Sequence, residues 1–121
     1  MGIEQLKGFQ LEGVRFSISS YALDFQGFQN QVPKTYHVGT NYYLSPSKTK
    51  LIDASERISE TLWPILGETL IDTAINENEK FTYIEFLFEN NESFVVWQES
   101  TAEDNLLIVR NPHSDEWFTV L

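Results

Sequence analysis

The chain of 121 residues contains no cysteine and only two histidines. The absence of cysteine excludes disulfide bonds, thiol catalysis and thiolate metal sites together. His37 and His113 lie far apart in the sequence, and neither has a second nitrogen ligand or carboxylate at a spacing typical of metal sites. We therefore expect no metal and no cofactor.

Several motifs that would indicate catalysis or targeting are also missing. The sequence has no Gly-x-Ser-x-Gly elbow, no Walker motif and no Gly-x-Gly-x-x-Gly fingerprint. The pattern predicts a protein that is not an enzyme, although paired carboxylates are set by distance in space and leave no mark in a sequence. The first residues lack the apolar region of a secretory signal, and no stretch approaches the length of a membrane span. We expect a cytoplasmic protein without membrane contact.

The composition is sufficient for a folded core. Hydrophobic residues make up 41% of the chain and aromatic residues 14%, enough to offset the entropy lost on folding in a chain of this size. No repeat, low-complexity tract or proline cluster marks a linker. The sequence therefore predicts a single domain over residues 1–121.

The net charge of -10 is distributed unevenly along the chain. Residues 1–60 hold six acids and six bases, which cancel, whereas residues 61–121 hold twelve acids against Lys80 and Arg110. Such a field repels phosphate backbones and attracts basic partners. It predicts association with a basic protein and not with nucleic acid.

Short apolar runs separated by polar turns fill the second half of the chain. They predict strands over Leu70–Asn76, Thr82–Phe88, Phe94–Glu99, Leu106–Arg110 and Trp117–Leu121. The turn Glu89-Asn90-Asn91-Glu92 joins the second and third of these, because asparagine tolerates the positive φ of a tight turn. Neighbouring strands joined in this way pair antiparallel.

The first half contributes fewer clear elements. Val14, Phe16 and Ile18 alternate with polar residues as in a strand, whereas residues 25–43 form an aromatic loop region whose pairing is left open. Asp53 with Glu56 three positions later is typical of a helix start, and Pro64 ends that helix near Trp63. We therefore predict an α+β fold, mainly β, in which an antiparallel meander sheet of about five or six strands carries one short helix on a face.

Aromatic rings near acids on the predicted strands and turns mark the candidate partner site. Large rings surrounded by charge are typical of interface hot spots. The predicted partner-binding residues are Glu89, Glu92, Trp97, Glu99, Glu103, Asp104, Glu116 and Trp117. A merely solvated acidic face is the alternative reading of the same acids.

A family resemblance adds to this interpretation. The predicted helix, then Trp63-Pro64-Ile65-Leu66-Gly67-Glu68-Thr69-Leu70, then the hairpin strand Ile84-Glu85-Phe86-Leu87-Phe88 with its acidic turn, resembles small acidic immunity proteins of bacterial contact-dependent inhibition and polymorphic toxin systems. The resemblance implies a cytosolic inhibitor that binds and neutralises one cognate toxin domain, often a nuclease. A protein- or small-ligand-binding adaptor domain without catalytic activity is the alternative, and a homodimer through a strand edge is compatible with either.

Overall fold

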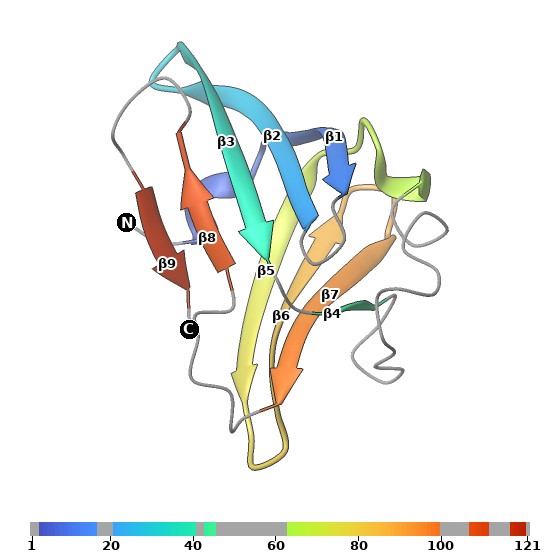
Figure 1. Ribbon diagram of the computed structural model, residues 1–121. Coiled ribbons are helices and arrows are strands. Elements are labelled where there is room, and N and C mark those ends of the chain that lie inside the picture. Colours follow the sequence, from blue (N-terminus) through green and yellow to red (C-terminus); the bar gives the residue numbers. More distant parts are fainter. Residues whose placement is uncertain are drawn as a thin grey trace.

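The computed structural model describes residues 3–16, 21–40, 43–45, 63–99, 107–111 and 117–120, and β-strands account for most of them (Figure 1). In chain order the elements are η1 (Ile3–Leu6), β1 (Gln10–Phe16), β2 (Tyr21–Gln29), β3 (Val32–Thr40), β4 (Tyr43–Ser45), η2 (Trp63–Ile65), β5 (Leu70–Glu77), β6 (Phe81–Phe88), β7 (Ser93–Glu99), β8 (Leu107–Arg110) and β9 (Trp117–Val120).

These strands form two antiparallel sheets. One has five strands in the order β1-β2-β3-β8-β9, and the other has four in the order β4-β7-β6-β5. The antiparallel, mainly β class is therefore confirmed, but the prediction of one meander sheet of five or six strands is wrong. After β7 the chain leaves the four-stranded sheet, and β8 pairs with β3 instead of β7.

Consecutive hairpins join β5, β6 and β7, as predicted from the sequence. β6 pairs antiparallel with both neighbours, and its residues alternate between half-buried and buried along the whole strand. Asn91 in the turn between β6 and β7 has a φ of 68°, the left-handed conformation that asparagine tolerates. The local pattern of side chains and turn residues thus fixes this part of the fold.

β2 and β3 form a long hairpin in the region interpreted as an aromatic loop. Their register runs without a break from Tyr21 opposite Thr40 to Gln29 opposite Val32. Asn30 and Gln31 make the two-residue turn with φ of 51° and 68°, the sign that a type I′ turn requires at both central positions. The loop interpretation of residues 25–43 is therefore wrong over 25–40.

A seam of backbone hydrogen bonds joins the two sheets along β1. The N–H of Gly8 donates to the carbonyl of Leu70 at 2.8 Å, and the N–H of Leu11 donates to the carbonyl of Glu68 at 3.1 Å. Gln10 pairs with Thr69 between them in an antiparallel bridge. The register shifts beside this seam in both β1 and β5, and such bulges bend a strand. The four-stranded sheet can therefore fold over the five-stranded one.

Phenylalanine rings fill the core between the sheets. Phe25 of β2 stacks on Phe86 and Phe88 of β6, with ring centroids 6.2 Å and 6.4 Å apart. Phe86 also stacks on Phe94 of β7 at 4.6 Å. All four side chains are fully buried, and each such burial stabilises the fold by roughly 1.5–3 kcal/mol relative to exposure. Each sheet therefore supplies rings that bury those of the other.

The predicted helix from Asp53 to Trp63 falls almost entirely on residues 51–62, outside the described residues. Within the described part of the chain, the helical segments are the short 3-10 turns η1 and η2. η1 nevertheless belongs to the core, because Ile3 and Leu6 are buried in it. None of the helices in the described residues has the length and apolar character needed to cross a membrane.

Candidate functional site

Charge is separated between the two sheets. Residues 68–99, which hold β5, β6, β7 and their turns, contain eight acids against one base, Lys80, and so carry a net charge of -7. The described strands of the five-stranded sheet carry a net charge of +1, from Arg15, Lys34 and Arg110 against Glu12 and Asp24. Arg110 belongs to the acidic half of the sequence, but β8 carries it to the other sheet.

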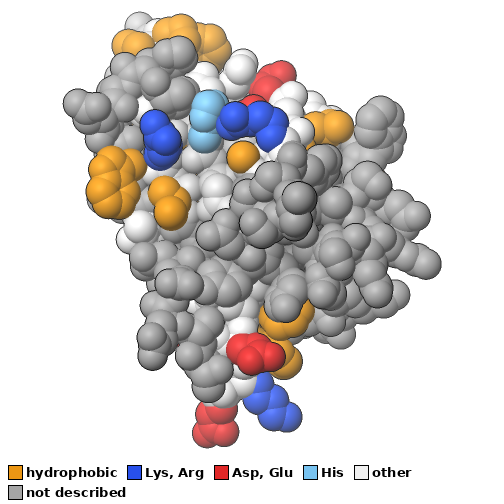
Figure 2. Space-filling view, in the orientation of Figure 1, with side chains coloured by type: hydrophobic (Ala, Val, Ile, Leu, Met, Phe, Trp, Pro, Cys, Tyr) orange, Lys and Arg blue, Asp and Glu red, His pale blue; other side chains and the backbone are white. Residues whose placement is uncertain are grey.

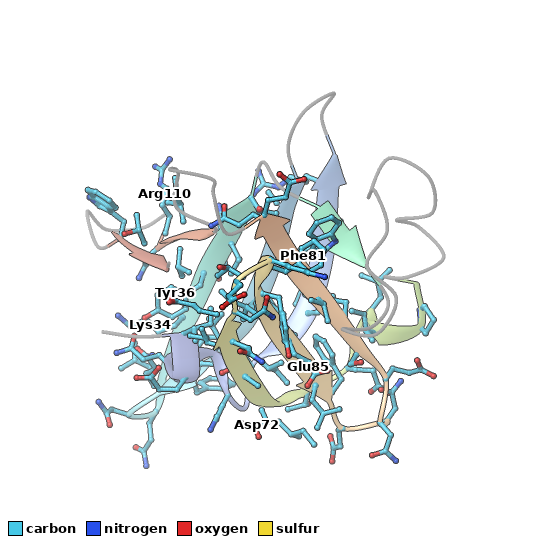
Figure 3. The ribbon with its side chains drawn as sticks, turned by 90° about the horizontal axis from the view of Figure 1, so that it is seen from below. Lys34, Tyr36, Asp72, Phe81, Glu85 and Arg110 are labelled. Atoms are coloured by element: carbon cyan, nitrogen blue, oxygen red, sulfur yellow. The ribbon has the colours of Figure 1, made fainter. Side chains whose placement is uncertain are left out.

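Aromatic rings and carboxylates share the outer face of the four-stranded sheet. We call this surface the acidic–aromatic face, and its members are Asp72, Asn76, Phe81, Tyr83, Glu85, Trp97 and Glu99. On β6 these positions alternate with the buried residues Thr82, Ile84 and Phe86 that face the core. Figure 3 shows Phe81, Glu85 and Asp72 on this sheet and Arg110 beside the other one.

Contacts between side chains fix the rings on the acidic–aromatic face. Phe81 meets Trp97 edge-to-face, with ring centroids 5.4 Å apart and planes at 90°. The side-chain amide of Asn76 donates to the Tyr83 hydroxyl at 2.9 Å. Glu99 lies directly opposite Phe81 in the register. The half-buried rings of Phe81 and Tyr83 therefore lie in fixed positions beside an exposed carboxylate.

Asp72 at the start of this face forms an ion pair with Lys7. The Lys7 Nζ lies 3.1 Å from Asp72 Oδ1, and the backbone N–H of Thr73 donates to the same oxygen at 2.9 Å. The hydrogen bond from Lys7, supported by that of Thr73 and by the charge of Lys7, lowers the pKa of Asp72 below its usual value. The charge of Asp72 is therefore matched by Lys7 within the molecule.

The turn with Glu89 and Glu92 lies at the other end of β7 from Glu99. Its backbone is fixed by Asn90, whose side chain accepts from the N–H of Glu92 at 3.1 Å and donates to the carbonyl of Pro64 at 3.0 Å. Both acids are exposed. A seven-residue strand separates them from Glu99 by roughly 20 Å.

The structure distributes the predicted site residues over separate surfaces. Trp97 and Glu99 lie together on the acidic–aromatic face, where the ring of Trp97 packs against Phe81 and is only 8% exposed. Trp117 lies on β9 of the other sheet and is 64% exposed. Glu103, Asp104 and Glu116 fall outside the described residues.

The five-stranded sheet also gathers two arginines and a histidine, a grouping that the sequence does not predict. Arg15, His37 and Arg110 come from β1, β3 and β8, and the register brings them to one outer face. Figure 2 shows basic side chains on either side of the histidine on this face. His37 and Arg110 point outward because they alternate with the buried Val38 and Val109. Had residues 32–40 been predicted as a strand, the same alternation would have placed His37 on the outer face.

A groove of about 480 Å³ lies on the same sheet, near the end of the β2–β3 hairpin. Four uncharged polar residues line it in a row, Thr69, Gln10, Gln26 and Thr35. One acid, one base and an aromatic ring that is 72% exposed also line the groove, Glu12, Lys34 and Phe28. Amide, hydroxyl and charged groups beside an aromatic ring are suited to a small polar ligand.

The described residues contain no group of three or more histidine, aspartate or glutamate side chains that could hold a metal ion. Comparison of the chain with protein-family models, with curated proteins and with solved structures finds no match. Functional inference therefore depends on the geometry and charge of the surfaces described above.

Proposed function

We propose that the protein is an immunity-type inhibitor that binds and neutralises a basic, nuclease-like toxin domain in the cytoplasm through its acidic–aromatic face. The observation that carries the proposal is the net charge of -7 over residues 68–99, gathered on one of the two sheets. A domain that binds phosphates has a basic surface, and a rigid anionic sheet competes with nucleic acid for that surface.

The acidic–aromatic face offers two kinds of contact to a basic side chain. The half-buried rings of Phe81 and Tyr83 can take a guanidinium or ammonium group on their faces. The exposed carboxylate of Glu99, opposite Phe81, can accept hydrogen bonds from the same group. Since Trp97 and Asn76 hold the two rings, little side-chain entropy is lost when a partner binds.

The distribution of charge also supports fast and oriented association. A basic partner is attracted to the four-stranded sheet and repelled by the cationic side chains of the other sheet. The turn with Glu89 and Glu92 extends the negative surface to the far end of β7. The partner would therefore approach with its basic surface toward β5, β6 and β7.

The alternative adaptor function is favoured by one observation, the groove with its row of Thr69, Gln10, Gln26 and Thr35. A small polar ligand would bind there without involving the acidic–aromatic face. Native mass spectrometry of the purified protein separates the two functions, because a bound metabolite favours the adaptor and a basic protein partner favours the inhibitor.

Binding kinetics with a panel of basic nuclease toxin domains as probes test the proposal. The variant Glu99→Lys with Glu85→Lys should lower the association rate by about tenfold at low salt, and raising the salt should lower the wild-type rate, because exposed charges are screened beyond about 8–10 Å. Tyr83→Ala should raise the dissociation rate, since it removes a ring from the contact surface.

The matched control reverses two acids away from this face, Glu4→Lys with Glu12→Lys. This double variant has the same change in net charge, so it should leave the association rate within about twofold of the wild type. Equal loss in both double variants would show that net charge alone matters, and no loss in either would place the contact elsewhere. Either result would reject the acidic–aromatic face as the site.

A further inference from the structure

Two arginines of the five-stranded sheet lie in one row of side chains that crosses all five of its strands. We call it the cationic row, and its members are Arg15, Asp24, His37, Arg110 and Trp117. In the register His37 lies directly opposite both Asp24 and Arg110, and Arg110 lies directly opposite Trp117. Arg15 on β1 reaches Asp24 from the neighbouring position.

The single carboxylate of the row is already matched. Arg15 Nη2 donates to Asp24 Oδ1 at 2.9 Å, and His37 Nε2 lies 3.4 Å from the same oxygen. The side chain of Arg110, on the other side of His37, is exposed, and no ion pair or side-chain hydrogen bond joins it to another described residue. A planar guanidinium of this kind can bind a carboxylate through two parallel N–H groups.

Exposed apolar side chains border this guanidinium. Trp117 is 64% exposed and Ile108, two positions before Arg110, is 47% exposed. The residue opposite Ile108 on β3 is Gly39, which leaves the sheet surface beside Ile108 without a side chain. Figure 2 shows hydrophobic side chains next to the basic ones on this face. Tryptophan and arginine side by side are the residue types most enriched in binding hot spots.

We propose that the cationic row binds an acidic peptide segment of a protein partner, with a carboxylate on Arg110 and a neighbouring apolar side chain on Trp117 and Ile108. The sign of the charge selects this occupant, because the described strands of the five-stranded sheet have a net charge of +1 whereas residues 68–99 have -7. An acidic segment is thus repelled by the four-stranded sheet and attracted by the arginines of this face. The site lies on the other sheet from the acidic–aromatic face and does not depend on the proposed function.

The same charges disfavour a nucleic acid on this face. A polyphosphate chain carries uniform negative charge over a length far greater than the row, and the net charge of -10 repels it. A peptide needs only one or two carboxylates near Arg110, and it supplies the apolar side chain that Trp117 requires. Peptide binding therefore uses both the Arg110 guanidinium and the exposed ring of Trp117.

Titration of the ¹⁵N-labelled protein with a hexapeptide of alternating glutamate and leucine tests this proposal. We expect the amide shifts to change in β3, β8 and β9, together with the indole N–H of Trp117. The twin peptide with lysine in place of glutamate should leave these strands unchanged. Arg110→Gln should weaken binding of the acidic peptide by about tenfold. Arg110→Lys should weaken it by less, because lysine keeps the charge but cannot make the two parallel hydrogen bonds of the planar guanidinium.

Further variants separate the row from general charge effects. Trp117→Ala should weaken binding by about fivefold or more through loss of the apolar contact. The control Lys80→Gln removes one positive charge from the turn between β5 and β6 and should change binding by less than about twofold. The spectrum of each variant without peptide checks that the variant is folded.

Three outcomes would overturn the proposal. One is an Arg110→Gln variant that binds the acidic peptide as tightly as the wild type does. A second is shift changes centred on the four-stranded sheet. The third is tighter, Arg110-dependent binding of a single-stranded oligothymidine, which would make the row a nucleic-acid surface. Since Arg110→Gln leaves the acidic–aromatic face intact, its binding to the basic partner of the proposed function should be unchanged, so the two proposals fail separately.

Discussion

The ring of Phe9 lies so close to the backbone of Gly27 that a Cβ atom at position 27 would stand 2.7 Å from Phe9 Cδ1 and 2.8 Å from Phe9 Cγ. Gly27 follows Phe25 by two positions on the inward face of β2, and Phe9 is buried with its ring 5.6 Å from that of Tyr36. The absence of a side chain at position 27 is therefore what allows Phe9 to enter the core.

Gly27→Ala should destabilise the protein by about 1–3 kcal/mol, because the added methyl group must displace a buried ring. The free energy of unfolding in urea, followed by tryptophan fluorescence, measures this change. Gly13→Ala is the matched control in β1, since a Cβ there would make an ordinary contact of 3.6 Å with Asp24. Equal effects of the two changes would show that the Phe9 contact has no energetic weight.

Phe86→Ala should lower the free energy of unfolding by about 3–5 kcal/mol, because it leaves a cavity among Phe25, Phe88 and Phe94. Phe28→Ala removes the same ring at a position that is 72% exposed and should cost less than about 1 kcal/mol. A loss below about 1 kcal/mol for Phe86→Ala in urea unfolding would contradict the stacked core.

Lys7→Gln should raise the pKa of Asp72 toward its usual value of 3.8, because it removes both the hydrogen bond and the charge that lower that pKa. NMR titration of the carboxyl carbon measures the change. Since the pKa is lowered by folding, the pair stabilises the protein above pH 3.8 and loses this effect as the pH falls through the folded pKa of Asp72. Lys80→Gln, the control, should leave this titration unaltered.

Gln31→Gly should stabilise the protein by up to about 1 kcal/mol, because a side chain at a φ of 68° carries a steric cost that glycine avoids. Gln31→Ala keeps the Cβ and should give no gain. Thermal unfolding of the two variants is the measurement. A gain from alanine equal to that from glycine would assign the effect to the glutamine side chain and not to the backbone.

The sequence predicts β5, β6 and β7 well because their structure depends on local features. Alternating burial along β6 and the asparagine turn at Asn91 are both readable from neighbouring residues. The pairing of β8 with β3 is different, since His37 and Arg110 are about seventy residues apart and nothing near either one specifies the other. The division into two sheets therefore escaped the sequence interpretation.

Charge is a second property that the sequence predicts only in part. The acidic second half is visible in the composition, and Glu99 and Trp97 do lie together. The position of Trp117 beside Arg110 is set by the pairing of β9 with β8, which the residues near Trp117 in the sequence do not specify. The buried ring of Trp97 shows the same limit, because exposure depends on the whole fold.

The seam between β1 and residues 67–70 has a consequence for synthesis on the ribosome. Gln10 cannot pair with Thr69 until about sixty more residues have been synthesised, and β3 cannot pair with β8 until the chain is nearly complete. Contacts between such distant residues slow folding, typically to milliseconds or longer. The β1–β2–β3 hairpins can form early, but the inner face that holds Phe25 stays exposed to water until β6 and β7 emerge, so we expect the nascent chain to be the aggregation-prone stage and a client of chaperones.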